Sequence, residues 1–282
     1  MKIAVLTDSG CGLTKEQVEA KGLYFLPLQI IDGDNVYLDG VDTTTEQIFQ
    51  MLEDGKMLKT SLPPIGLVEE MLEKMKEDGY EHLIFVPLSA GISGTMQAVK
   101  LAADNVGLPI TCFEIYTTAF IQMYIAESAK RLVDEGLDIE EIKTRIQASI
   151  DDSNTFLIVE NLDHLAAGGR LTPMAARLGG MLKIKPILKL NESSGGKVDQ
   201  HAKVRTMSKA IKQAVDTFLE RGIDDSYVIA ILHVNADEAG VLMKELYFDA
   251  VQTDMKVFGL LAPVIAAHTG TGAIGLQYIK KV

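Results

Sequence analysis

The sequence has little cysteine, no tryptophan and no long apolar run. Its 282 residues include only two cysteines, Cys11 and Cys112, which are too few for a disulfide framework. We therefore expect the protein to reside in a reducing cytoplasm. No apolar run reaches the roughly 18 to 20 residues that a membrane span needs, so we expect no stable membrane insertion. Residues 1–6 predict a first strand and not a signal peptide, because Asp8 follows at once without a cleavage site.

Positive charge is also scarce, with a net charge of −12. This balance argues against nucleic acid as the main partner. The deficit is uneven: residues 1–162 carry 12 Lys and Arg against 27 Asp and Glu, and residues 163–282 carry 15 against 12. Residues 170–212 are basic, which indicates either a solvated face or a site for a phosphate or an acidic protein surface. The basic residues are Arg170, Arg177, Lys183, Lys185, Lys189, Lys197, Lys203, Arg205, Lys209 and Lys212.

The first 162 residues alternate between strand-like and helix-like patterns. Apolar runs predict strands over 3–6, 24–31, 83–88, 109–115 and 155–160, and helical spacing predicts helices over 14–21, 45–54, 65–78, 94–105, 118–135 and 139–150. Such alternation is typical of a mostly parallel sheet flanked by helices. We therefore expect an N-terminal α/β domain over 1–162, with ligands favouring the carboxyl ends of its strands.

Residues 163–282 predict a second domain of the α+β class. A helix is expected from Pro173 through 182, and a β-hairpin over 186–190 and 198–204 with its turn at 193–196. Helices over 207–220 and 236–246 and strands over 228–233 and 275–279 complete the domain. The fold class is thus α/β with two domains.

A serine and several glycines occupy the turn between the strand at 83–88 and the next helix. Gly91 and Gly94 allow close backbone approach to a ligand, and the free N–H groups of a helix that begins near Thr95 favour an anion. Ser93 is then a candidate ligand-binding hydroxyl, although the same pattern fits a simple helix cap.

Two further segments carry candidate polar groups. Thr60 and Ser61 precede a proline pair that can open a helix. His268 and Thr269 lie in a second glycine-rich stretch, where the imidazole is expected to face a site and to be able to carry charge near neutral pH. These hydroxyls and one imidazole suit the binding of an anionic oxygen group better than bond cleavage.

Other site chemistries find weaker support in the sequence. A serine esterase could use Ser93 with His268 as base, but Thr95 stands where the hydrolase motif has its last glycine and no orienting acid is evident. Gly270, Gly272 and Gly275 match a dinucleotide pattern, but too close to the C-terminus for a βαβ unit. The histidines show no metal-ligand spacing, so we expect no metal.

In an ordered series of short motifs the chain resembles the DegV family of fatty-acid-binding proteins, the acyl-carrying subunits of bacterial fatty acid kinase. The motifs run through the whole chain. They are Thr7-Asp8-Ser9, Thr60-Ser61-x-Pro63, residues 89–95, Leu165 to Arg170, Lys185 to Leu188, Val204-Arg205 and His268-Thr269-Gly270-x-Gly272.

The resemblance implies a long-chain fatty acid between the two domains and no cofactor. Its carboxylate would be held by the hydroxyl and histidine motifs, and a kinase subunit would supply ATP and metal and phosphorylate it, so the chain itself is expected not to be a catalyst. Arg170 and Arg205 match family arginines near the mouth, where partner or phosphate contact is expected. The implied fatty-acid-binding residues are Thr60, Ser61, Ser93, Gly94, Thr95, His268 and Thr269.

The chain departs from the family pattern at two places. Glu114 and the residues after it replace the usual Asp-Ser or Asp-Thr pair, and Thr271 replaces a proline. Two other classes of function remain open at this point: the serine esterase, and an interaction protein whose basic face recruits a partner while a lipid only fills the core.

Overall fold

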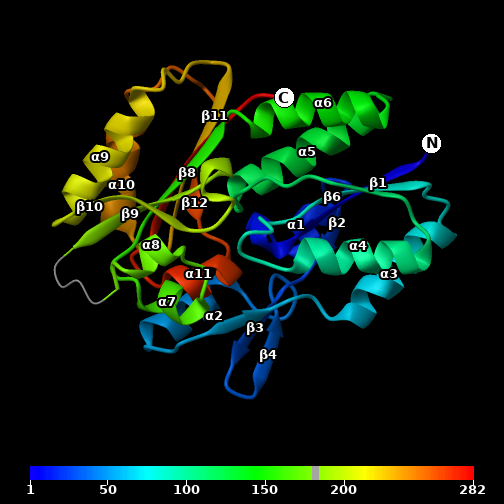
Figure 1. The fold of residues 1–282 in the computed structure, drawn as a ribbon, viewed down its shortest axis with the longest axis horizontal. Coiled ribbons are helices and arrows are strands. Elements are labelled where there is room, and N and C mark those ends of the chain that lie inside the picture. The colour runs from blue at the N-terminus through cyan, green and yellow to red at the C-terminus, as the bar shows by residue number, and fades with distance from the viewer. Residues whose placement is uncertain (180–183) are drawn as a thin grey trace.

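The computed structural model describes residues 1–179 and 184–282, and it is an α/β protein with a parallel and a mixed sheet (Figure 1). The parallel sheet has the order β2 (Tyr24–Leu26), β1 (Ile3–Asp8), β6 (His82–Val86) and β7 (Ile110–Cys112). α3 (Ile65–Glu77) and α4 (Thr95–Val106) cover one face, and α5 (Phe120–Asp134) covers the other. Side chains along β1 alternate between these two cores, because successive residues of a strand point to opposite faces.

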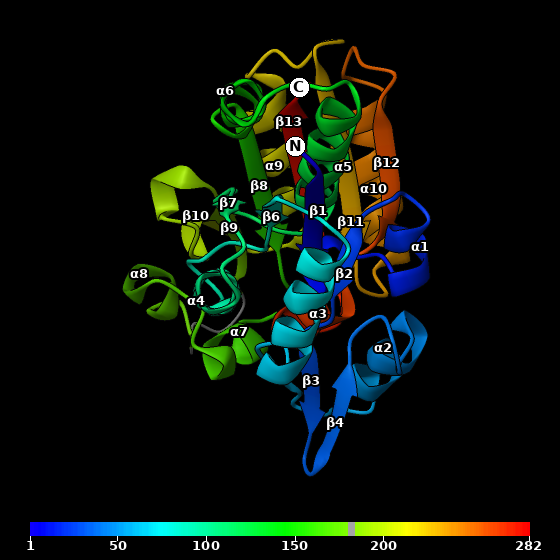
Figure 2. The same ribbon diagram turned by 90° about the vertical axis from the view of Figure 1, so that its right-hand side faces the viewer.

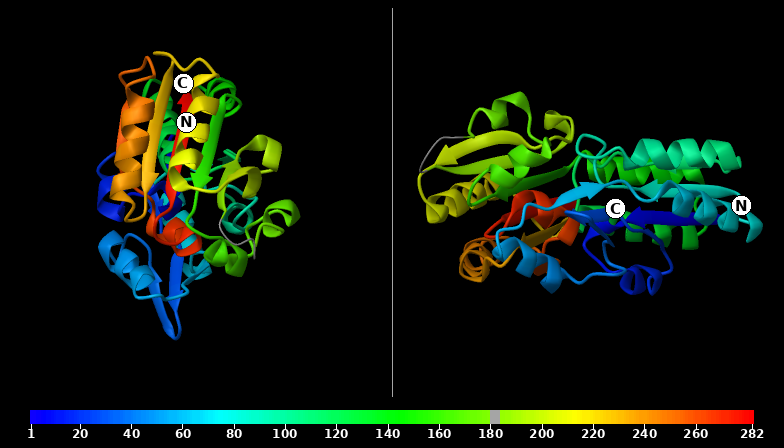
Figure 3. Two further views of the ribbon diagram at one scale, coloured as in Figure 1. Left: turned by 90° about the vertical axis from the view of Figure 1, so that its left-hand side faces the viewer. Right: turned by 90° about the horizontal axis from the view of Figure 1, so that it is seen from below.

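The mixed sheet belongs to the C-terminal part. Its order is β10 (Asp199–Val204), β9 (Lys185–Leu190), β8 (Ser153–Ile158), β13 (Ile274–Lys280), β11 (Tyr227–His233) and β12 (Lys256–Leu260), with only the last pair parallel. α9 (Met207–Leu219) and α10 (Asp237–Phe248) cover its outer face, away from the parallel sheet (Figure 3). The inner face meets α5 and α6 (Ile139–Ile150), which joins the two sheets into one body.

A small antiparallel sheet and several short helices complete the chain. β4 (Asn35–Leu38), β3 (Gln29–Asp32) and β5 (Lys59–Ser61) form a sheet that projects from the body next to α2 (Thr45–Glu53) (Figure 2). α11 (Pro263–Thr269) packs against α2, β5 and α7 (Asp163–Gly168), so it links the small sheet to the C-terminal part. The remaining elements are η1 (Ser9–Cys11), α1 (Lys15–Glu19), α8 (Pro173–Ala176) and η2 (Glu192–Ser194).

The structure confirms the expected fold class, and the β9–β10 hairpin lies where it was predicted. Several elements differ. The strand expected over 24–31 is two strands in different sheets, β2 and β3, because Pro27 has no N–H to continue the pairing. The strand expected over 155–160 is β8, which pairs with β9 and β13 and not with the parallel sheet.

Other expectations need smaller changes. β4, β5, β12, α7 and α11 were not predicted. The helix expected over 173–182 begins at Pro173 and is helical to Ala176, while residues 180–182 and Lys183 lie outside the described residues. The division of the chain at 162/163 remains a prediction. Among the described residues, no helix is both long enough and apolar enough to cross a bilayer.

Candidate functional site

A cavity of about 300 Å³ lies between the inner face of the mixed sheet and the loops of the N-terminal part. Most of its lining is aliphatic, and a channel of this kind suits a hydrocarbon ligand. The aliphatic side chains are Leu28, Leu62, Leu88, Ile92, Leu157, Leu165, Leu190, Val198, Leu232, Leu261, Val264 and Ile265.

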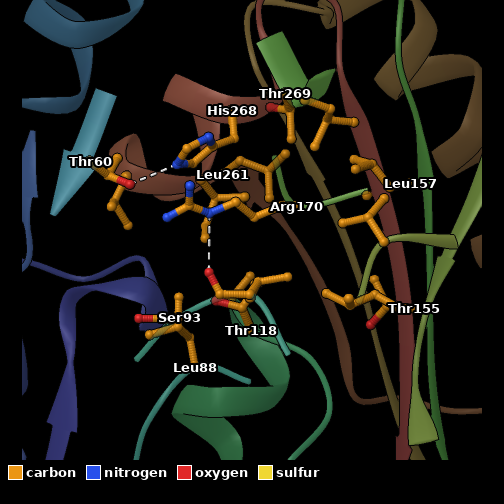
Figure 4. A pocket seen from close by; sticks show the side chains of 18 of the residues that line it. Thr60, Leu88, Ser93, Thr118, Thr155, Leu157, Arg170, Leu261, His268 and Thr269 are labelled. Atoms are coloured by element: carbon orange, nitrogen blue, oxygen red, sulfur yellow. Dashed lines mark hydrogen bonds between the residues drawn. The ribbon is translucent and has the colours of Figure 1, made fainter. Parts of the chain in front are cut away.

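One cluster of polar groups lies at one end of this cavity (Figure 4). Polar side chains also occur in the rest of the lining, at Thr118, Thr155, Lys189 and Gln277. Thr60 comes from β5, Ser93 from the loop before α4 and His268 from α11. The Thr60 hydroxyl and His268 Nε2 share a hydrogen bond of 2.7 Å. Ser61 and Gly94 also line the cavity and are exposed at the surface, so this end is the mouth. An apolar channel with hydroxyls and an imidazole at its mouth matches an amphiphile with one acidic end.

The loop before α4 aims Ser93 at the cavity. α4 begins at Thr95, and its N-cap Gly94 makes no side-chain cap bond. Instead the Thr95 N–H donates to Ser93 Oγ at 3.2 Å, and the two hydroxyls lie 2.8 Å apart. Thr95 itself is fully buried behind Ser93 and does not line the cavity. Its expected contact with a ligand is therefore replaced by support of Ser93.

His268 lies in the last turn of α11 and not in a glycine-rich turn as expected, because the helix continues to Thr269 before Gly270 ends it. Burial, the nearby Arg170 guanidinium and His164 lower the pKa of His268 to about 4. The imidazole is thus neutral at pH 7, contrary to the expected charge. A neutral ring protonated at Nε2 donates to Thr60, and one protonated at Nδ1 accepts from it.

The two arginines differ in position. Arg170 lines the cavity, and its Nε donates to the carbonyl oxygen of Ile92 at 3.2 Å while Nη1 donates to Gly168. It thereby connects the C-terminal part to the loop that carries Ser93. Arg205 follows β10, is exposed and does not line the cavity. Of the two, only Arg170 is close enough to act on a head group.

The structure adds residues that the sequence reasoning missed. Thr155 and Leu157 of β8, Leu232 of β11, and Gly275 and Gln277 of β13 line the wall opposite the mouth. Figure 4 shows Thr155 and Leu157 across the cavity from Thr60 and Ser93. The sequence contains one sign of this wall. Gly275 and Gln277 stand two positions apart in a mostly apolar strand and therefore share one face.

The geometry does not favour an esterase. The hydrogen-bond partners of Ser93 Oγ are groups of Thr95, while His268 Nε2 is bonded to Thr60. Among the described residues, His268 Nδ1 has no partner, so the orienting acid of a catalytic triad is missing. No group of three or more metal-ligating side chains occurs in the part of the chain that the structure describes.

Glu114, at one of the departures from the family pattern, bonds to two loop segments. Its carboxylate accepts hydrogen bonds from the N–H groups of Ala90 at 2.8 Å and Tyr116 at 2.7 Å. The glutamate side chain, which is longer than the usual aspartate, thus connects its own turn to the loop that carries Ser93.

Comparison with known proteins agrees with this picture. The family model described as "Uncharacterised protein, DegV family" matches residues 2–281. The chain belongs to the DegV family. It is 34% identical to a DegV domain-containing protein of Streptococcus pneumoniae, with 100% of both chains covered.

Solved DegV structures share the whole fold. A fatty acid binding DegV family protein from Streptococcus agalactiae superposes with a TM-score of 0.90 at 31% identity and covers 100% of both chains. DegV from Bacillus subtilis, a fatty acid binding protein, gives a TM-score of 0.86 at 28% identity, again over 100% of both chains. Both of these relatives are fatty acid binding proteins, and both share the whole fold of this chain.

Proposed function

We propose that this protein binds one long-chain fatty acid in the cavity, with the tail against the mixed sheet and the carboxylate at the mouth. The observation that carries the proposal is an aliphatic channel that ends in Thr60, Ser93 and His268. DegV relatives that bind fatty acids share the complete fold. Ser61, Gly94 and Thr269 complete the head-group site, with Thr95 supporting Ser93.

The tail supplies most of the affinity. A chain of about sixteen carbons gains roughly 0.8 kcal/mol per buried CH₂, or on the order of 10 kcal/mol before the costs of association. The hydroxyls and the neutral imidazole then mainly fix the position of the head group. Arg170 compensates the negative charge of the carboxylate, since its guanidinium faces the same cavity.

We further propose that the protein is a carrier and not a catalyst, acting in the cytoplasm, and that it presents the carboxylate to a fatty acid kinase. The mouth is open at Ser61 and Gly94, so a carboxylate oxygen there can be reached from outside. In-line phosphoryl transfer requires such access, together with charge neutralisation that the kinase and its metal provide. Exposed basic residues such as Arg205 are then available for the partner.

Binding is tested by mass spectrometry of the lipid extracted from the purified, denatured protein, followed by titration of stearic acid into the delipidated protein. We expect one fatty acid per chain in both experiments. Absence of extracted fatty acid together with no uptake would contradict the proposal.

The kinase step is tested with Arg205→Glu, using Arg145→Glu on α6 as a control of equal charge change. We expect the first variant to retain its lipid but lose acyl phosphate formation, and the control to keep both. Equal turnover of both variants would remove Arg205 from the partner contact.

A further inference from the structure

Asp8, at the end of β1, is a fully buried carboxylate that the proposed binding site does not use. Its two oxygens accept three hydrogen bonds from three segments. Gly10 N–H of η1 and Gln122 Nε2 of α5 donate to Oδ1 at 2.9 and 2.8 Å, and Leu88 N–H donates to Oδ2 at 3.0 Å. Few side chains other than a carboxylate can accept from three donors, because an ionised carboxyl group has no hydrogen of its own.

The hydrogen bond from the Leu88 N–H connects Asp8 directly to a segment of the head-group site. Leu88 lines the cavity and opens the loop, residues 88–94, that carries Ser93. Within this loop the Ser93 N–H donates to the carbonyl oxygen of Ser89 at 3.2 Å, so the position of Ser93 depends on the start of the loop. Asp8 therefore fixes the loop at the end nearest the parallel sheet.

The hydrogen bond between Gln122 and Asp8 connects Asp8 to the part of the cavity lining around Thr118, which we call the cavity floor. Thr118 lines the cavity, and its hydroxyl lies 3.1 Å from the Gly10 carbonyl oxygen and 3.3 Å from Gln122 Oε1, so its one hydrogen is donated to one of two groups whose residues both bond to Asp8. Gln277 Nε2 of β13 donates to the Thr118 carbonyl oxygen at 3.0 Å. A buried polar network thus runs from Asp8 under the cavity to the mixed sheet, and Gln277 lines the opposite wall.

We propose that Asp8 is a positioning residue for the fatty acid head group: its carboxylate holds the 88–94 loop and the Thr118 floor, and so sets where Ser93 meets the carboxylate of the ligand. This inference rests on the proposed function. Asparagine cannot replace Asp8, because either orientation of its amide sets an N–H₂ group against at least one of the three N–H donors.

The test compares Asp8→Asn with Thr253→Val by titration of stearic acid and of methyl stearate, which keeps the tail but has no free carboxylate. Thr253 is a fair control because its hydroxyl is also buried and hydrogen-bonded, donating to the Tyr227 carbonyl oxygen at 2.7 Å and accepting from the Met255 N–H at 3.2 Å, but it neither lines the cavity nor bonds to the Asp8 network. We expect Asp8→Asn to weaken the affinity for stearic acid about tenfold, as the loss of a buried hydrogen bond implies. The affinity for methyl stearate should fall by less than about twofold. Thr253→Val should leave both affinities near those of the wild type.

Two further measurements keep the test decisive. Amide hydrogen exchange of residues 88–94 in the ligand-free protein should quicken in Asp8→Asn and not in Thr253→Val, a readout that does not depend on lipid binding. If Asp8→Asn does not fold, Gln122→Met removes one donor while keeping the carboxylate, and we expect about a threefold loss for stearic acid. Equal effects on both ligands, or unchanged exchange of the loop, overturn the positioning role. A wild-type protein that binds neither ligand overturns the proposed function instead.

Discussion

The two ends of the cavity are built in different ways. The mouth is assembled from β5, the 88–94 loop, α11 and Arg170, segments that are far apart in the sequence. The opposite wall is one face of a regular sheet, formed by β8, β11 and β13. The sheet face offers aliphatic side chains at regular spacing, with Thr155 and Gln277 as polar positions among them, whereas the mouth segments bring Thr60, Ser93 and His268 together.

This difference separates affinity from position. In the proposed complex the sheet wall buries the hydrocarbon tail, and its contribution grows with each methylene in contact. The mouth exchanges hydrogen bonds with water for hydrogen bonds with the protein, so its net contribution is small, but it fixes one oxygen at an accessible point. Changes to the wall should therefore reduce binding most.

The largest effect is expected from Gly275→Val. Gly275 is a strand residue on the lining face, and a Cβ there meets the Leu232 carbonyl oxygen and Leu261 Cδ2 only at 3.7 and 3.8 Å, in ordinary contact. The backbone thus accepts the valine, whose methyl groups occupy the ligand space. We expect about a 100-fold weaker affinity for stearic acid by calorimetry, since overfilling a packed site costs about 1–3 kcal/mol.

Gly259→Val is the matched control, because Gly259 is a glycine of the same sheet that does not line this cavity. It should bind stearic acid as the wild type does. Similar losses in both variants would contradict the assignment of the sheet face as the tail wall.

Asp39 lies beside the start of α11, near the segments that form the mouth. Its substitution measures the free-energy cost of burying a charged group there. It is 1% exposed, and neither carboxylate oxygen has a hydrogen-bond partner among the described residues. Burial raises the pKa of Asp39 from 3.8 to about 7, and the nearby Ser9 hydroxyl and Val264 N–H, whose geometry falls short of a hydrogen bond, lower it only in part. Between these pH values the native protein holds a proton that the unfolded chain has released, so the free energy of unfolding falls as pH rises through this window.

We therefore expect Asp39→Asn to raise the free energy of unfolding by about 2 kcal/mol at pH 8 and by little at pH 4. Urea denaturation at the two pH values measures the difference. Asp34→Asn, at an exposed position in the β3–β4 turn, should change neither value. A destabilised Asp39→Asn at pH 8 would show that the ionised carboxylate is held by favourable contacts.

A smaller effect on binding is expected at the mouth. Thr60→Val removes the hydroxyl that bonds His268 Nε2 while keeping the shape of the side chain. We expect about a tenfold loss of affinity for stearic acid, the scale of one buried hydrogen bond, with little change in chain-length preference. Thr144→Val, on the exposed face of α6, is the control. A loss as large as that of Gly275→Val would contradict the division between affinity and position.

The smallest effect is expected at Ala119, which lines the cavity floor and precedes α5. Its φ of 60° and ψ of −130° form a backbone conformation that costs a residue with a Cβ about 1 kcal/mol or more. Ala119→Gly should raise the free energy of unfolding by about 1 kcal/mol in urea denaturation. Ala98→Gly inside α4 should instead lower it by roughly the same amount.

Much of the fold follows from local patterns in the sequence. The apolar runs at 83–88 and the helical spacing at 65–78 correspond to β6 and α3. The mouth was also predicted in part, because glycines and hydroxyl residues beside a predicted helix start are typical of turns that bind anions. His268 was expected in a turn, although Pro263 and Gly270 give the ordinary signals of a helix start and stop.

The tail wall could not be read from the sequence in the same way. Gly275 and Thr155 share the wall opposite the mouth only because β8 pairs with β13, more than 100 residues away along the chain. β5 is too short to be recognised without β3 beside it, and Asp8 acquires its role only when Leu88 and Gln122 approach it. Periodicity identifies a buried face but not the segment that packs on it.

A crystal structure of the protein with stearic acid tests the central claim most directly. We expect the carboxylate within hydrogen-bond reach of Ser93 and of Thr60 or His268, and the tail along Leu157, Leu232 and Gly275. A fatty acid lying in the reverse direction, with its carboxylate beside Thr155, or a cavity filled by protein side chains, would contradict it.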